Sequence, residues 1–198
     1  MPRKKADGSD REAARKKIME AAVEALREQS AAALTVEAVA RRAGCAKGLV
    51  HYHFKTKSAL FAAAAERIWS SRAAAWTTAL SGSDPQTAIQ QGWKLLGMEA
   101  RDGIDRACSS LATVDDDLID RSVRKGVSDF ADALGKAAVA LFGSVGIRFT
   151  LPEAEIGRLA AAVVMGLGPQ IVLSGDETAV EGAYSAFWAG LLSMTGRA

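Results

Sequence analysis

Apolar residues recur along most of the chain at the spacing of one helical face, and polar or glycine-containing breaks separate these segments. Apolar residues at positions 18, 21, 22, 25 and 26, for example, predict a helix over about residues 10–29. The same reasoning predicts further helices over about 35–43, 46–54, 58–80, 85–101, 104–111, 115–142, 153–173 and 176–195. We find no credible strand and no internal repeat. The pattern therefore predicts an all-α fold of about nine helices.

Two prolines bear on the predicted helix boundaries. Asp84 and Pro85 follow a Ser-Gly-Ser break, so Asp84 is expected to cap the helix that Pro85 opens. Pro169 lies inside the predicted helix 153–173, where it removes one backbone hydrogen bond and is expected to kink the helix.

The segment 35–54 has the pattern of two short helices joined by a tight turn. Thr35 can cap the first helix, and Gly44 supplies the left-handed conformation that commonly ends a helix. Val50 and Phe54 share one face of the second helix, which leaves a largely polar face opposite. This is the pattern of a helix-turn-helix, whose second helix enters the DNA major groove. The plain alternative is a helical hairpin with a glycine turn.

Charged residues are distributed unevenly along the chain. Residues 1–57 contain 13 Lys or Arg and 7 Asp or Glu, a net charge of +6, whereas residues 58–198 contain 12 and 16, a net charge of −4; together they give the +2 of the whole chain. A basic segment attracts DNA phosphates, and an acidic one is repelled by them. The sequence thus predicts a disordered basic arm over 1–9, a helix-turn-helix domain over 10–57 and a separate body over 58–198.

Composition narrows the class of protein. Apolar residues make up 49% of the 198 positions, enough for a packed core. Two cysteines, Cys45 and Cys108, do not make a disulfide framework, and the N-terminus lacks the apolar region of a secretory signal. No run of 18 apolar residues occurs, so no membrane span is expected. We expect a cytoplasmic protein.

The motif Thr35-x-x-x-Val39-Ala40-x-x-Ala43-Gly44, followed by Lys47-Gly48, Tyr52-His53-Phe54 and Lys57, closely resembles the DNA-binding domain of TetR-type transcriptional regulators. The resemblance covers roughly residues 18–61. It implies a regulator, most readily a ligand-released repressor, that binds a palindromic operator as a homodimer. It also implies contacts to phosphates or base edges from eight residues: Thr35, Lys47, Gly48, Leu49, His51, Tyr52, His53 and Lys57.

Three positions depart from the family pattern. Ala46 stands where a small hydroxyl residue is common, so the second helix lacks a side-chain cap. His51 replaces the usual tyrosine, and Glu37 stands where some members carry a basic residue. A carboxylate at position 37 accepts from cytosine or repels phosphate.

The resemblance also gives the body two expected roles. In TetR-type regulators the last two helices form the dimer interface, for which we expect Val164, Tyr184, Phe187, Trp188 and Leu191. A small-molecule inducer pocket is expected among the middle helices. Its candidate residues are Trp69, Trp93, Met98, Phe130, Met165 and Gln170.

Other readings of the sequence stay open. A helical ligand-binding protein or enzyme with an idle helix-turn-helix fits the same pattern, as does an activator. No nucleophile motif or glycine-rich phosphate loop is present, so we expect no enzymatic activity and no cofactor. His51 and His53 point about 200° apart on a helix, which makes metal binding by this pair unfavourable. The acidic run Asp115–Asp117 reads more simply as a helix start favoured by the helix dipole than as a cation site.

Overall fold

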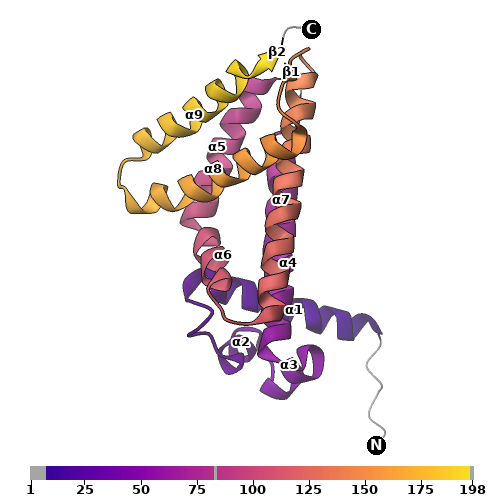
Figure 1. The fold of residues 1–198 in the computed structure, drawn as a ribbon. Coiled ribbons are helices and arrows are strands. Elements are labelled where there is room, and N and C mark those ends of the chain that lie inside the picture. Colours follow the sequence, from indigo (N-terminus) through magenta and orange to yellow (C-terminus); the bar gives the residue numbers. More distant parts are fainter. Residues whose placement is uncertain (1–7, 83, 197–198) are drawn as a thin grey trace, which may run out of the picture. The chain divides into compact units, whose positions relative to one another are not determined.

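The protein is described by a computed structural model that covers residues 8–82 and 84–196. Most of the predicted basic arm, residues 1–7, lies outside the described residues, whereas Gly8 and Ser9 already belong to the first helix. Figure 1 shows the helices and the short strands in chain order. These are α1 (Gly8–Glu28), α2 (Val36–Arg42), α3 (Lys47–Phe54), α4 (Lys57–Ala79), α5 (Pro85–Arg101), α6 (Ile104–Ala112), α7 (Asp117–Gly143), β1 (Arg148–Phe149), α8 (Glu153–Leu173), α9 (Glu177–Ser193) and β2 (Thr195–Gly196).

The all-α prediction is confirmed, with one small addition. Nine helices account for most of the described chain. Two short strands, β1 and β2, pair antiparallel, with Arg148 opposite Gly196 and Phe149 opposite Thr195. Only two residues pair on each side, too few to produce the alternating pattern by which a strand is found in a sequence.

Side-chain caps fix several helix starts. Asp84 Oδ1 and Oδ2 accept from the backbone N–H groups of Gln86 and Thr87, as its place before Pro85 predicts. At α4 the capping side chain is that of Thr56. Thr56 Oγ1 accepts from Ala59 N, while Ser58 lies inside the helix and donates to Asp116 Oδ2 at 2.6 Å.

The helix α8 continues through Pro169 rather than ending there. Among the described residues it is also the single helix long and apolar enough to cross a membrane, with a mean hydropathy of 1.6 over its most apolar 18 residues. Buried residues make up 44% of that window, and a core helix of a soluble protein has the same length and composition. The absence of a membrane span therefore stays a prediction.

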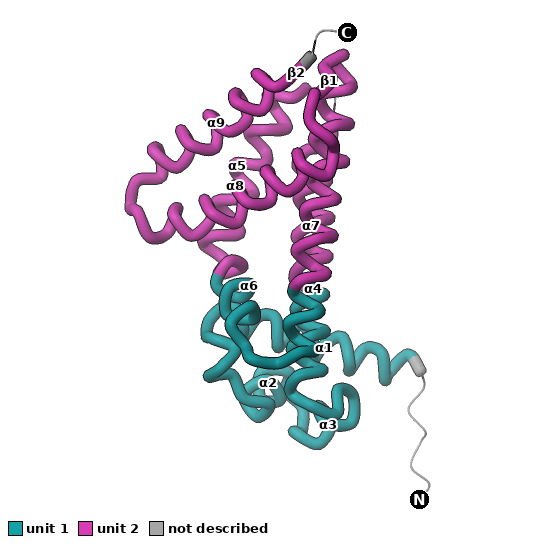
Figure 2. The backbone as a smooth tube through the Cα atoms, in the orientation of Figure 1, with its two compact units in different colours: residues 1–67, 106–123 teal, residues 68–105, 124–198 magenta. Residues whose placement is uncertain are grey.

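The chain forms two compact units, which Figure 2 colours separately. Unit 1 comprises the chain up to residue 67 together with 106–123, and unit 2 comprises 68–105 and 124–198. This division differs from the predicted boundary at 57/58, because the segment 106–123 packs with the N-terminal helices. Arg106 Nη1 donates to the Arg27 carbonyl at 3.1 Å, and Ser122 Oγ donates to Glu66 Oε1 at 3.3 Å.

Each unit has its own apolar core. In unit 1 the buried side chains come from α1 to the start of α4 and from the segment 106–123, and include Ile18, Leu26, Val39, Val50, Phe54, Leu60, Leu111 and Ile119. In unit 2 the buried side chains include the large aromatic residues Trp69, Trp76, Phe130, Phe142, Tyr184 and Trp188 among aliphatic neighbours. Burial of these large rings supplies much of the hydrophobic stabilisation of unit 2.

Candidate nucleic-acid interface and ligand site

The turn between α2 and α3 has the geometry that its sequence predicts. Thr35 is the N-cap of α2, and its Oγ1 accepts from Ala38 N at 3.1 Å. Gly44 has φ +62°, a conformation that residues with a side chain rarely adopt. Ala46 precedes α3 without a side-chain cap. Val50 and Phe54 are buried, so they fix which face of α3 points outward.

The outward face of α3 carries most of the predicted DNA contacts. Lys47, Gly48, Leu49, His51 and Tyr52 are exposed, with exposed fractions of 37% for Leu49 and 50% for Tyr52. A Cβ added to Gly48 would meet nothing within 4 Å. Packing within the protein therefore does not require glycine at this position, and the open backbone is free to approach another molecule.

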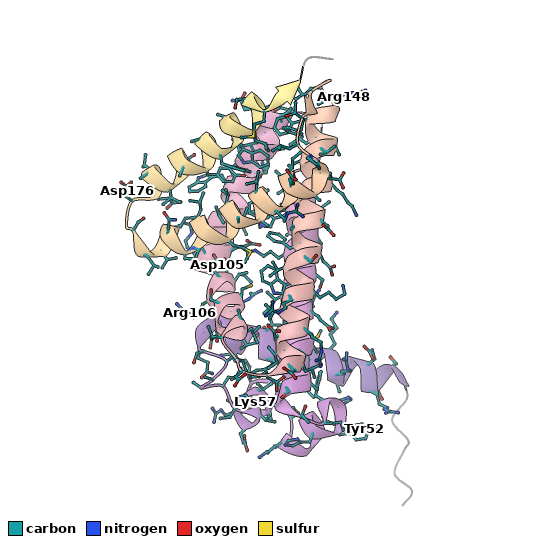
Figure 3. All side chains as sticks on the ribbon, viewed as in Figure 1. Tyr52, Lys57, Asp105, Arg106, Arg148 and Asp176 are labelled. Carbon is teal, nitrogen blue, oxygen red and sulfur yellow. The ribbon has the colours of Figure 1, made fainter. Side chains whose placement is uncertain are left out.

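The remaining predicted contacts flank this face within unit 1. Thr35 is exposed at the start of α2, whereas His53 and Lys57 are half-buried, at the end of α3 and the start of α4. Figure 3 labels Tyr52 and Lys57 among the side chains. All eight predicted residues thus belong to one compact unit, and none of them lies in its core.

Basic residues of α1 surround this face. The Arg11 guanidinium lies 5.4 Å from the centre of the Tyr52 ring, and Lys55 Nζ lies 5.4 Å from the same ring. Arg15 stacks 5.0 Å from the Phe54 ring. Burial, together with the positive charges of Arg11 and Arg15, lowers the pKa of His53, so its imidazole is neutral at neutral pH. The local field favours an anion such as phosphate.

The structure shows one ion pair beside this face that the sequence did not predict. Lys47 Nζ donates to Glu37 Oε1 across the turn, and both side chains are more than half exposed. This hydrogen bond is the main cause that lowers the pKa of Glu37. Glu37 therefore accepts from Lys47 in the free protein, an interaction that spacing within one helix does not reveal because the partners lie on different helices.

The predicted dimer residues are mostly core residues of the chain itself. Val164, Tyr184, Trp188 and Leu191 are each no more than 3% exposed, so they cannot present a surface to a second copy. The Tyr184 hydroxyl is also used internally, donating to the Ile89 carbonyl at 3.1 Å. In the single chain these four side chains belong to the core, because helical periodicity finds an apolar face but does not say what covers it. Phe187 is half-buried.

Other apolar residues of α8 are exposed instead. Leu159, Val172 and Leu173 have exposed fractions of 44%, 57% and 82%.

The predicted pocket residues separate into three groups. Trp69 and Phe130 are buried together, with their ring centres 5.7 Å apart. Trp93 and Met165 are half-buried. Met98 is 59% exposed on the face of α5 opposite the buried Leu96, and Gln170 is exposed, with Nε2 donating to the Gly166 carbonyl. The structure thus removes Met98 and Gln170 from the buried candidates.

Beside Trp69 and Phe130 lies a buried charged cluster that the sequence analysis did not predict. Arg72 Nε donates to Glu99 Oε2 at 2.9 Å, and Arg72 Nη2 donates to Asp105 Oδ1 at 3.0 Å. Trp76 Nε1 donates to the same Glu99 oxygen at 3.0 Å. Sequence periodicity did contain a signal, because Arg72 falls on the stripe formed by the apolar residues 68, 69 and 76.

A surface groove of about 540 Å³ lies elsewhere in unit 2 and contains none of the predicted pocket residues. It is lined by Thr77 of α4 and by Asp129, Asp132, Ala133, Lys136, Ala137 and Ala140 of α7. Within the described part of the chain, no group of three or more His, Cys, Asp or Glu is placed to hold a metal ion.

Comparison with known protein families finds a match over the segment that contains α2, the turn and α3. Residues 18–64 match the model of bacterial regulatory proteins of the tetR family. No curated protein sequence matches the chain.

Solved structures with a similar fold cover almost the whole chain. A putative TetR-family transcriptional regulator from Rhodococcus sp. is 20% identical, with a TM-score of 0.73 over 92% of this chain and 98% of its own. NalD, the secondary repressor of the MexAB-OprM multidrug efflux pump in Pseudomonas aeruginosa, is 20% identical, with a TM-score of 0.62 over 92% and 98%.

The structure of a complex of SmeT with triclosan is also similar. It is 18% identical, with a TM-score of 0.66 over 93% of this chain and 92% of its own. At these identities the likeness shows a shared fold, and the match over 18–64 locates the DNA-binding domain. Residues 18–64 thus match the tetR-family model, and the chain shares its fold with solved TetR-family regulators.

Proposed function

We propose that the protein is a cytoplasmic transcriptional repressor that binds a palindromic operator as a homodimer and releases it when a small molecule binds. The observation that carries this proposal is the exposed face of α3, which follows a capped α2 and a glycine turn within the matched segment 18–64. A regulator of this kind acts by binding alone, so we propose no enzymatic role.

On this proposal the residues divide by the part of DNA they contact. Thr35, Tyr52, His53 and Lys57 hold phosphates, because hydroxyl, imidazole N–H and ammonium groups are all donors. Lys47 donates to guanine O6 or N7, and Leu49 contacts a thymine methyl. Gly48 lets the backbone approach the bases, and His51 faces the same groove. Arg11 supports Tyr52 and adds positive charge beside the phosphates.

The dimer is proposed to form through α8 and α9. Leu159, Val172 and Leu173 supply the apolar contact, with Phe187 at its edge. Two-fold symmetry then presents one α3 to each half of a palindrome, with half-sites roughly one helical turn or somewhat more apart.

The ligand is proposed to bind in unit 2, near Trp69, Phe130, Trp93 and Met165. The complex of SmeT with triclosan and the repressor NalD support this proposal as proteins of the same fold. A ligand releases DNA only if it binds the operator-competent conformer less tightly than another conformer.

The test begins with selection of random duplexes, because the operator is unknown. Full-length protein would be incubated with a random-sequence library, and the retained duplexes would be amplified and sequenced over several rounds. We expect enrichment of an inverted repeat. No enrichment over the starting library, or enrichment of a single half-site by a monomeric protein, would contradict the proposal.

A further inference from the structure

The cluster of Arg72, Glu99 and Asp105 joins three helices inside unit 2. Arg72 comes from α4, Glu99 from α5 and Asp105 from α6 (Figure 3 labels Asp105). Their residues are 3%, 6% and 8% exposed. Burial of charged groups is costly unless each is paired and hydrogen-bonded. The charge balance and the hydrogen bonds of this cluster therefore bear on what it binds.

The charges of the cluster do not balance. One guanidinium faces two carboxyl groups, which leaves an excess of one negative charge when both carboxyls are ionised. Burial raises the pKa of Glu99 and of Asp105, in each case against the opposing effect of Arg72. The free protein therefore favours a proton on this pair of carboxyls.

One oxygen of the cluster also lacks a donor. Asp105 Oδ2 is buried and accepts no hydrogen bond. It lies against Gly168 of α8, where an added Cβ would overlap it. Gly168 therefore offers this oxygen no side-chain donor, and the following Pro169 offers no backbone N–H. A buried acceptor without a donor is destabilising, and such groups often mark a site that another molecule completes.

The surroundings suit a cation. The Arg72 guanidinium lies 5.7 Å from the Trp69 ring centre and 5.1 Å from the Phe130 ring centre. Aromatic faces attract cations, so the same rings that hold Arg72 favour a second positive group beside the carboxylates. A cation can replace the proton that the two carboxyl groups otherwise favour, whereas a neutral ligand cannot, and an anion would be repelled once both carboxyls are ionised.

We propose that the small molecule recognised by unit 2 is an organic cation with an aromatic or other apolar body, whose positive group is held by Glu99 and Asp105. The proposal rests on the proposed ligand-released regulator and names the chemical class of its ligand. The cation would replace the shared proton, which leaves to solvent, so that two positive charges face two carboxylates and Asp105 Oδ2 gains a partner.

The first test compares ligands of one size and different charge on the full-length protein. The probes are 2-(2-naphthyl)ethylamine, which is a cation at neutral pH, 2-(2-naphthyl)ethanol, which is neutral, and 2-naphthylacetate, which is an anion. Binding would be measured by isothermal titration calorimetry. We expect the cation to bind roughly ten- to a hundredfold more tightly than the alcohol, the range of a charge-assisted hydrogen bond, and the anion to bind most weakly.

The second test uses isosteric variants of the two carboxyls. Asp105→Asn and Glu99→Gln should each reduce the preference for the cation over the alcohol to within a fewfold. Glu155→Gln, at an exposed acid of α8, is the matched control and should keep the full preference. Helical content by circular dichroism would show that each variant is folded.

Two results would overturn the proposal. One is equal binding of cation and alcohol to the unaltered protein, a result that does not depend on whether any variant folds. The other is an unchanged cation preference in folded Asp105→Asn and Glu99→Gln. Binding of each protein to the selected operator is measured separately, so loss of the regulator proposal is distinguishable from loss of this one.

Discussion

At the residue scale, the exposed face of α3 combines the proposed hydrogen-bond donors to DNA with a carboxylate that competes for one of them. Lys47 is paired with Glu37 in the free protein, and both side chains are exposed. Exposed ion pairs contribute little to stability because solvent and salt screen them, so DNA can replace Glu37 as the partner of Lys47 at small cost. On the proposed docking, Glu37 would then lie near the bases and disfavour any position where it would meet a phosphate.

Substitution of Lys47 and Lys57 should separate base readout from phosphate binding. Lys57→Gln should weaken binding to all duplexes about equally and lower the salt dependence of log K by about 1. Lys47→Gln should cost about 1–3 kcal/mol on the operator and relax specificity at one base pair. Fluorescence anisotropy on operator and scrambled duplexes, at several salt concentrations, measures both effects.

Lys136→Gln is the matched control, because Lys136 is an exposed lysine of unit 2. It should leave operator affinity unchanged. If Lys47→Gln and Lys57→Gln behave like this control, α3 is not the DNA-reading helix.

At the element scale, the helix boundaries follow from local sequence, whereas the covered face of each helix does not. The Thr35 cap, the Gly44 turn and the Asp84–Pro85 start depend on residues within a few positions of one another, and sequence predicts them. Burial of Tyr184 and Trp188 depends on packing of α9 against other helices of unit 2. Periodicity marks these residues as apolar but cannot assign them to the core or to an interface.

A substitution on α8 should therefore test the proposed interface. Leu159→Glu combined with Leu173→Glu places two charges in the proposed apolar contact and should convert the dimer to monomer at micromolar concentration. Met98→Glu changes an equally exposed apolar residue of α5 and should leave the dimer intact. Sedimentation velocity gives the masses. A dimer that survives the double substitution would place the interface elsewhere.

At the scale of the whole molecule, sequence predicts the fold class and a basic DNA-binding segment, but not the division into compact units. Residues 106–123 join unit 1 through contacts between residues far apart in the sequence. The hydrogen bond from Arg106 to the Arg27 carbonyl, for example, joins positions 79 apart in the chain. The Arg72 cluster is equally nonlocal, because its partners come from three helices. Local patterns record neither kind of contact, whereas the α2–α3 face, whose residues are close in sequence, is largely predicted.

The Arg72 cluster predicts a particular pH dependence of stability. Because the pKa values of Glu99 and Asp105 are raised in the folded state, that state binds more protons than the unfolded one. Their contribution to stability therefore falls as pH rises from about 4 through the raised folded values.

Urea unfolding of the unaltered protein and of Asp105→Asn at several pH values measures this dependence. The unaltered protein should lose stability relative to the variant as pH rises over that window. A stability difference between the two proteins that does not change with pH would show that Asp105 is ionised throughout.

The central claim, that α3 reads DNA sequence in a dimeric regulator, is tested most directly by anisotropy of the unaltered protein on its selected duplex. A scrambled duplex of equal length is the control, and both are measured at about 50 and 200 mM salt. We expect at least about a thousandfold tighter binding to the selected duplex, two chains per duplex, and weaker binding at high salt. Equal, weak binding to both duplexes would contradict the account.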